Sequence, residues 1–178
     1  MELLWCFFAY SLMGFCLEVA FARAVRCPKR DRKCLYLLPL CPVYGLGAVL
    51  ILLLPPALRN TPLLLIPSAA LIATAAEYIM ALFYEKVWRV QFWNYAALPL
   101  NLHGRVCLQF SAAWALLALP LVYWVQPWLS RIVASLPPAL LLALLLLFLT
   151  DTVLTGLVLR KAGDTRALIW YRRPVSHP

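Results

Sequence analysis

The sequence is poor in charged residues, and poorest in negative ones. Only 13% of its 178 residues are charged and seven are Asp or Glu, whereas 65% are hydrophobic. A soluble domain carries about 25% charged residues, so this composition excludes an ordinary soluble protein and predicts an integral membrane protein. The net charge of +9 does not indicate nucleic-acid binding, because basic loops beside membrane helices explain the same surplus.

Motifs of catalysis and cofactor binding are also missing. No GxxxxGK[ST] loop occurs, so the chain does not hydrolyse ATP by that route. The six cysteines form no CxxC pair, and Cys27, Cys34 and Cys41 are seven residues apart, wider than usual zinc-ligand spacings. His103 and His177 are the only histidines, and no Ser-His-Asp order stands out. We expect no catalytic residue, metal or cofactor, which favours a role other than catalysis.

Long apolar blocks dominate what is present. A helix needs about 20 apolar residues to cross a bilayer, and five blocks are long enough, namely residues 3–25, 35–58, 62–84, 106–128 and 137–159. Continuous apolar runs exclude a transmembrane barrel, whose strands alternate. The sequence therefore predicts an all-α polytopic membrane protein, with a single domain over residues 1–178 and five transmembrane helices.

Basic residues predict the orientation. Fourteen of the sixteen Lys and Arg residues follow block one, separate blocks three and four, or follow block five, and the other two are Arg59 and Arg131. Because cytoplasmic loops are enriched in Lys and Arg, we expect an outside N-terminus and a cytosolic tail over residues 160–178. Residues 88–104 then lie on the cytosolic side as an interfacial or re-entrant segment before helix four. Disulfides are not expected on this reducing side.

Three carboxylates interrupt the apolar blocks. Glu18, Glu77 and Asp151 lie five, nine and nine residues before a basic residue, which places all three in one layer of the inner leaflet. An ionisable group inside a membrane is costly and needs a reason. We expect Arg105 and His103, which begin helix four, to approach this layer. Three further residues complete the predicted ligand-binding set, because they can hydrogen-bond there: Tyr44, Asn94 and Asn101.

Three interpretations of these acids remain open: an ion-pair and hydrogen-bond network that fixes helix packing, a site for a solute or cation, and a catalytic site. The acids can also stay protonated through burial. The glycines of "CPVYGLGA", Gly45 and Gly47, favour a close helix crossing over phosphate binding, because this stretch begins a membrane helix.

Four ordered motifs carry a family resemblance. They are "YSLMGFCLE" (Tyr10–Glu18), "CPVYGLGA" (Cys41–Ala48), "EYIMALFYEKVW" (Glu77–Trp88) and "FWNYAALPLNLHGRVCL" (Phe92–Leu108). Over about residues 10–123 the chain resembles the bacterial family called putative ABC-transporter permease, type IV, or CmpB-like. It departs from the family where Asn94 replaces the usual Asp, so chemistry assigned to that carboxylate does not carry over.

The resemblance implies a multi-pass protein of the bacterial inner membrane that works with a partner ATPase. Because 178 residues are few for a permease, the alternative is a homo-oligomer. We therefore expect a permease-like subunit, embedded in the lipid bilayer, with a cytosol-facing polar pocket for a small solute or ion. The alternatives are a non-transporting membrane scaffold, whose buried acids only fix helix packing, and an inner-leaflet membrane enzyme.

Overall fold

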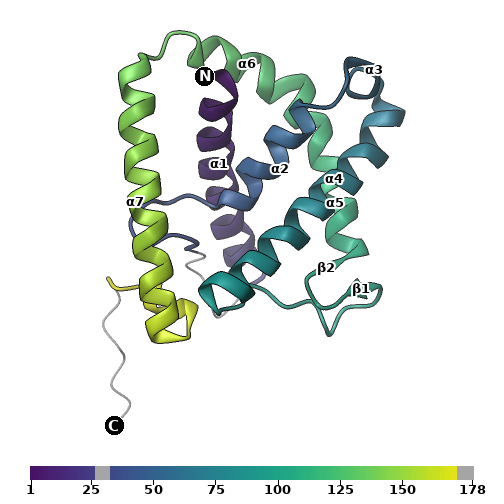
Figure 1. Ribbon diagram of the computed structural model, residues 1–178. Coiled ribbons are helices and arrows are strands. Elements are labelled where there is room, and N and C mark those ends of the chain that lie inside the picture. Colours follow the sequence, from purple (N-terminus) through teal and green to yellow (C-terminus); the bar gives the residue numbers. More distant parts are fainter. Residues whose placement is uncertain (27–32, 172–178) are drawn as a thin grey trace.

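The computed structural model describes residues 1–26 and 33–171 as an all-α bundle (Figure 1). Four of its helical segments are long and apolar enough to cross a membrane, namely Glu2–Ala24, Pro62–Trp88, Leu108–Val133 and Pro138–Ala162. A fifth apolar helix, Pro42–Leu52, has only 11 residues and is about 16 Å long, roughly half the thickness of a hydrocarbon core. By its helix composition the chain is a multi-pass membrane protein.

The elements follow one another along the chain as α1 (Glu2–Ala24), α2 (Pro42–Leu52), α3 (Pro56–Arg59), α4 (Pro62–Phe83), the π-helical turn η1 (Tyr84–Trp88), β1 (Asn101–Leu102), β2 (Val106–Cys107), α5 (Leu108–Pro120), the π-helical turn η2 (Leu121–Val125), α6 (Gln126–Val133), α7 (Pro138–Ala162) and the 3₁₀ turn η3 (Thr165–Leu168). The second π-helical turn directly follows Pro120, which lacks the N–H that would continue the α-helical ladder. Four of the five predicted blocks therefore correspond to long helices.

The prediction of one helix over residues 35–58 is wrong. Residues 33–41 are not helical, α2 begins at Pro42, and the chain turns after Leu52. The carboxylate of Asp151 on α7 accepts hydrogen bonds from the backbone N–H groups of Leu37 and Leu38 at 2.9 and 2.7 Å. In a continuous helix, the N–H groups of Leu37 and Leu38 would bond to carbonyl groups of the same helix. Here the Asp151 side chain of α7 accepts these bonds instead, so the segment does not need to be helical. In Figure 1, α2 starts beside the middle of α1 and runs toward α3.

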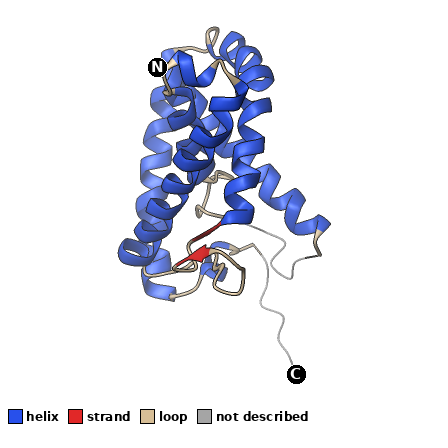
Figure 2. Ribbon diagram, turned by 90° about the vertical axis from the view of Figure 1, so that its right-hand side faces the viewer, coloured by secondary structure: helices blue, strands red, loops and turns tan. Residues whose placement is uncertain are grey.

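Two ends of the bundle are distinct. The C-terminal ends of α1, α4 and α7 lie at the same end of the bundle as β1 and β2, and the N-terminus, α3 and α6 lie at the opposite end (Figure 1). Figure 2 shows the same arrangement from the side, with the two short strands at one end of the helices. We call these the hairpin end and the α6 end. The strands are antiparallel, with Asn101 opposite Cys107, and His103 and Gly104 turn between them with positive φ.

Close helix approach positions α2 on α1. A Cβ added to Gly14 would lie 2.2 Å from Cγ of Tyr44, and one added to Gly45 would lie 2.2 Å from Oγ of Ser11. The expected close crossing is therefore present at Gly45. At Gly47 it is not, because an added Cβ would meet nothing within 4 Å.

Candidate functional site

Glu18 and Glu77 belong to one chain of contacts across four helices. The Tyr44 hydroxyl of α2 donates to Oε1 of Glu18 on α1 at 2.7 Å. The rings of Tyr44 and Trp114 lie 4.7 Å apart between their centroids, and Nε1–H of Trp114 on α5 donates to Oε2 of Glu77 on α4 at 3.2 Å. We call Glu18, Tyr44, Glu77, Tyr95 and Trp114 the acid network. Two carboxylates from separate helices are thus linked through the adjoining rings of their donors Tyr44 and Trp114.

The loop between α4 and α5 supplies the fifth member of the network. The hydroxyl group of Tyr95 donates to Oε1 of Glu77 at 3.0 Å, and its ring stacks on Phe110 at 4.7 Å. Burial raises the pKa of Tyr95 well above its usual range, and the neighbouring charges of Glu77 and Glu18 raise it further. Tyr95 therefore stays protonated and remains a donor near neutral pH.

In the part of the chain that the structure describes, the hydrogen-bond donors to Glu77 are neutral side chains. Its exposed fraction is 4%, and its hydrogen-bond partners are Tyr95 and Trp114. Within residues 1–26 and 33–171, no Lys or Arg lies within ion-pair distance of Glu77. A buried carboxylate without a cationic side chain is stabilised by binding a proton or a small cation. This arrangement is chemically suited to cation binding.

Asp151 has a different role from the other two acids. It is fully buried and accepts the N–H groups of Leu37 and Leu38, while Thr155 one turn later accepts the N–H of Tyr36 at 2.9 Å. These contacts anchor residues 33–41 to α7. Asp151 makes no contact with the acid network among these bonds, so its surroundings are those of a structural carboxylate.

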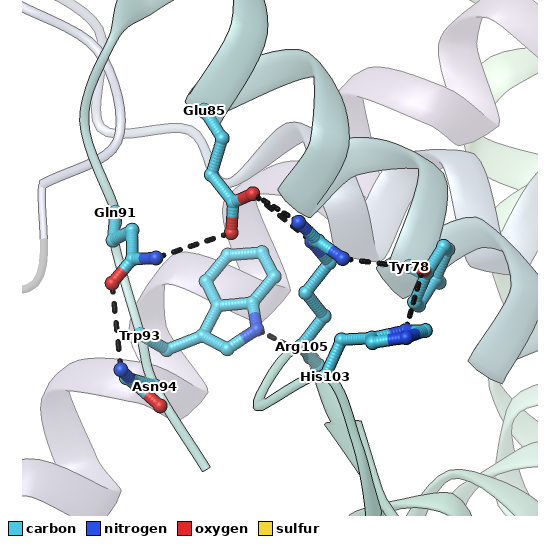
Figure 3. Close-up of polar contacts among 7 residues, drawn as sticks. All are labelled: Tyr78, Glu85, Gln91, Trp93, Asn94, His103 and Arg105. Carbon is cyan, nitrogen blue, oxygen red and sulfur yellow. Dashed lines mark hydrogen bonds and ion pairs between the residues drawn. The ribbon is translucent and has the colours of Figure 1, made fainter. Parts of the chain in front are cut away.

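Arg105 pairs with an acid that the sequence analysis did not single out. Nε and Nη2 of Arg105 donate to Oε2 of Glu85 at 3.0 and 2.6 Å, and Nη1 donates to the hydroxyl of Tyr78 at 3.2 Å. Figure 3 draws these contacts. Nδ1 of His103 lies 3.0 Å from the same hydroxyl. The bonds to Glu85 raise the pKa of Arg105. The approach of Arg105 and His103 to the buried acids, expected from the sequence, is replaced by this ion pair beside the network.

The two asparagines shape the loop. Oδ1 of Asn94 accepts the N–H of Ala96 at 2.8 Å, and Asn101 bonds Leu98 O and Gly104 N at 2.7 and 3.0 Å. Such short-range bonds are typical of Asx turns. Nε1 of Trp93 donates to the carbonyl of Arg105 at 2.8 Å (Figure 3). These contacts hold the loop in the conformation that places Tyr95 over Glu77.

Two members of the network were missed from the sequence. The acids could be recognised because charged residues are rare in apolar helices. Tyr95 and Trp114 are neutral, and aromatic residues are frequent throughout this sequence, so nothing distinguished these two. Tyr78 in α4 and Glu85 in η1 are seven residues apart in one continuous helical segment, and this spacing was a signal for the partner of Arg105. The sulfur atoms of Cys34 and Cys41, both buried, lie 2.7 Å apart.

Comparison with known proteins assigns the family. A model of the family described as "Putative ABC-transporter type IV" matches residues 5–156. The chain belongs to this family. The matched region contains every residue of the acid network as well as Asp151 and Arg105. A search of curated proteins and a search of solved structures each returned no match.

Proposed function

We propose that this family member is a permease-like subunit whose acid network binds a small monovalent cation, which displaces a proton from Glu77. The main support for this proposal is that Glu77 is buried among neutral donors. Glu18 is linked to it through Tyr44 and Trp114. Ionisable side chains within membrane helices mark ion and substrate pathways in other proteins. The half-length helix α2 adds support, because interrupted helices often form substrate sites in transporters.

The proposed orientation places the hairpin end in the cytosol, with the N-terminus outside, in a bacterial inner membrane. The basic residues that the structure describes support it, because Arg23, Lys86 and Arg160 are in the last turns of α1, η1 and α7, and these helical segments finish at the hairpin end (Figure 1). The cation would then reach Glu77 past Tyr95 from the cytosolic side. Because the chain has no ATP-binding loop of the P-loop type, energy would come from a separate ATPase, as the family description suggests, or the chain would act as a homo-oligomer.

The scaffold alternative is favoured at Asp151, where the acid is fully engaged by backbone N–H groups. It does not account for Glu77 equally well. A carboxylate oxygen can accept two hydrogen bonds, and a buried acid that only fixes packing is expected to have this capacity filled. In the described residues each oxygen of Glu77 accepts one hydrogen bond, so part of its capacity is unused.

The test uses dicyclohexylcarbodiimide, which modifies protonated carboxyl groups in apolar surroundings. Purified protein is treated with the reagent in sodium, potassium or ammonium chloride, or in choline chloride as a bulky control, and the modified residue is identified by mass spectrometry. We expect modification of Glu77 that falls as one small cation is added and rises as the pH falls, because cation and proton compete for one site.

Glu77→Gln should abolish this modification while leaving the melting temperature close to that of the wild type. Glu85→Gln is the matched control, since Glu85 lies two turns further along the same helical segment and outside the network. Modification of Glu77 that is indifferent to every cation tested would support the scaffold function instead.

A further inference from the structure

A cavity of about 480 Å³ lies at the α6 end, away from the acid network. Its size is within the usual range for small-molecule sites. Apolar side chains such as Leu52 and Val122 form part of its wall, and the polar part is formed by Glu2, Arg59, Asn60, Tyr123, Gln126 and Ser130. It therefore combines an apolar wall with several convergent polar groups.

Two opposite charges line this cavity without pairing with each other. Oε1 of Glu2 accepts a hydrogen bond from Oγ of Ser130 at 2.8 Å, and Nη1 of Arg59 donates to the carbonyl of Leu52 at 2.5 Å. No ion pair joins Glu2 to Arg59 in the part of the chain that the structure describes. A carboxylate and a guanidinium separated across one cavity complement a ligand that carries both charges.

The surroundings place the cavity at the level of lipid headgroups. Trp124 and Trp128 are next to its lining residues in η2 and α6, and their exposed fractions are 76% and 61%. Exposed Trp side chains of membrane helices concentrate at the membrane–water interface. A ligand in the cavity would thus have its charged group at the headgroup layer and its apolar part beside the helices.

We propose that this cavity binds a zwitterion of the phosphoethanolamine type, with its phosphate on Arg59 and its ammonium on Glu2. Guanidinium groups bind phosphate oxygens through paired N–H donors. A primary ammonium has three N–H donors for the Glu2 carboxylate and the neighbouring oxygens, which a quaternary ammonium lacks. The ligand can be a membrane phospholipid or a soluble molecule with the same headgroup.

The test compares headgroups on the purified full chain in detergent. Native mass spectrometry and thermal unfolding are measured with phosphatidylethanolamine, with phosphatidylcholine, which has no N–H donor, and with phosphatidylglycerol, which has no ammonium. Soluble glycerophosphoethanolamine is measured separately. We expect phosphatidylethanolamine to bind about tenfold more tightly than either other lipid, an effect of the size given by one charge-assisted hydrogen bond.

Glu2→Gln and Arg59→Gln should each remove this preference. Glu2 is exposed at the start of α1, so its replacement leaves the bundle intact. Arg131→Gln is the matched control, because Arg131 is an exposed cation of α6 that does not line the cavity. Binding of the soluble compound alone would assign the site to a soluble zwitterion. Equal binding of all three lipids with no binding of the soluble compound, or the same loss in Arg131→Gln, would overturn the proposal.

Discussion

Buried carboxylates in this chain differ in what surrounds them. Glu77 is bonded by two neutral side chains, whereas Asp151 is bonded by backbone N–H groups of residues 37 and 38. Backbone donors fixed in place satisfy the acceptor oxygens of a buried acid. The two acids therefore differ in their donors, and the proposed binding rests on Glu77, whose donors are side chains.

Replacing Asp151 tests its structural role. Asp151→Asn removes the charge and one acceptor oxygen. The NH2 group of Asn is a donor, so it cannot accept a hydrogen bond from the N–H of Leu37 or Leu38. We expect the free energy of unfolding to fall by about 2 kcal/mol and the melting temperature in detergent to fall by roughly 5 °C. Asp164→Asn, an exposed acid beyond the end of α7, is the control and should have little effect. Equal melting temperatures for both variants would contradict the role given to Asp151.

Tyr95 gives the protein a measurable response to high pH. Its pKa is raised in the folded state by burial and by the neighbouring acids, so its contribution to stability is fully present below the unfolded value of about 10. That contribution is lost as the pH rises further, because the unfolded chain releases the proton first. The melting temperature of the wild type should therefore fall more steeply above about pH 10 than that of Tyr95→Phe. Parallel curves would show that Tyr95 is not held as described.

At the scale of elements, the junction between α1 and α2 sets the position of Tyr44. An added Cβ at Gly45 would lie 2.2 Å from Oγ of Ser11 and 2.4 Å from the carbonyl oxygen of Phe7. The backbone oxygen cannot move aside as a flexible side chain can. The close approach of α1 and α2 therefore depends on the absence of a side chain at Gly14 and at Gly45.

Two glycines of α2 provide a matched pair of substitutions. We expect Gly45→Ala to destabilise the protein by about 2 kcal/mol through overpacking. Gly47→Ala should be neutral or should stabilise by up to about 1 kcal/mol, because space is open there and Ala favours helix. Thermal unfolding of both variants in one detergent checks the order. The reverse order would contradict the described crossing of α1 and α2.

The long helices could be predicted from the sequence because apolar length decides them. The boundaries of α1, α4 and α7 follow the expected blocks within a few residues at each end. The half-length α2 could not be predicted, because the donors of residues 37 and 38 are satisfied by an acid more than a hundred positions later. Proline near the start of the block was the local sign of an interruption.

The acids of the candidate site and Tyr44 could be predicted from the sequence, whereas Tyr95 and Trp114 could not. Glu18 and Glu77 stood out as acids in apolar helices, and Tyr44 was expected near that layer. The pairing of Arg105 with Glu85 depends on how the loop turns back after η1, which the turns at Asn94 and Asn101 determine. Sequence spacing does not specify such a reversal.

At the scale of the whole molecule, the orientation in the membrane is the main expectation to test. Single cysteines are introduced at Ser135, between α6 and α7, or at Lys161, near the end of α7, in a variant whose six native cysteines are replaced by Ala. The two positions lie at opposite ends and are exposed. We expect an impermeant maleimide to label Ser135→Cys in intact cells and Lys161→Cys only after permeabilisation. Labelling in the reverse pattern would place the hairpin end outside and contradict the proposed cytosolic access to Glu77.

Proton release on cation binding tests the central claim most directly. Weakly buffered, detergent-solubilised protein is mixed with sodium, potassium or ammonium salt, and released protons are followed with a pH indicator. The account predicts release with at least one of these cations in the wild type and in Glu85→Gln, and none in Glu77→Gln. No release in the wild type with any of the three, or equal release in Glu77→Gln, would contradict it.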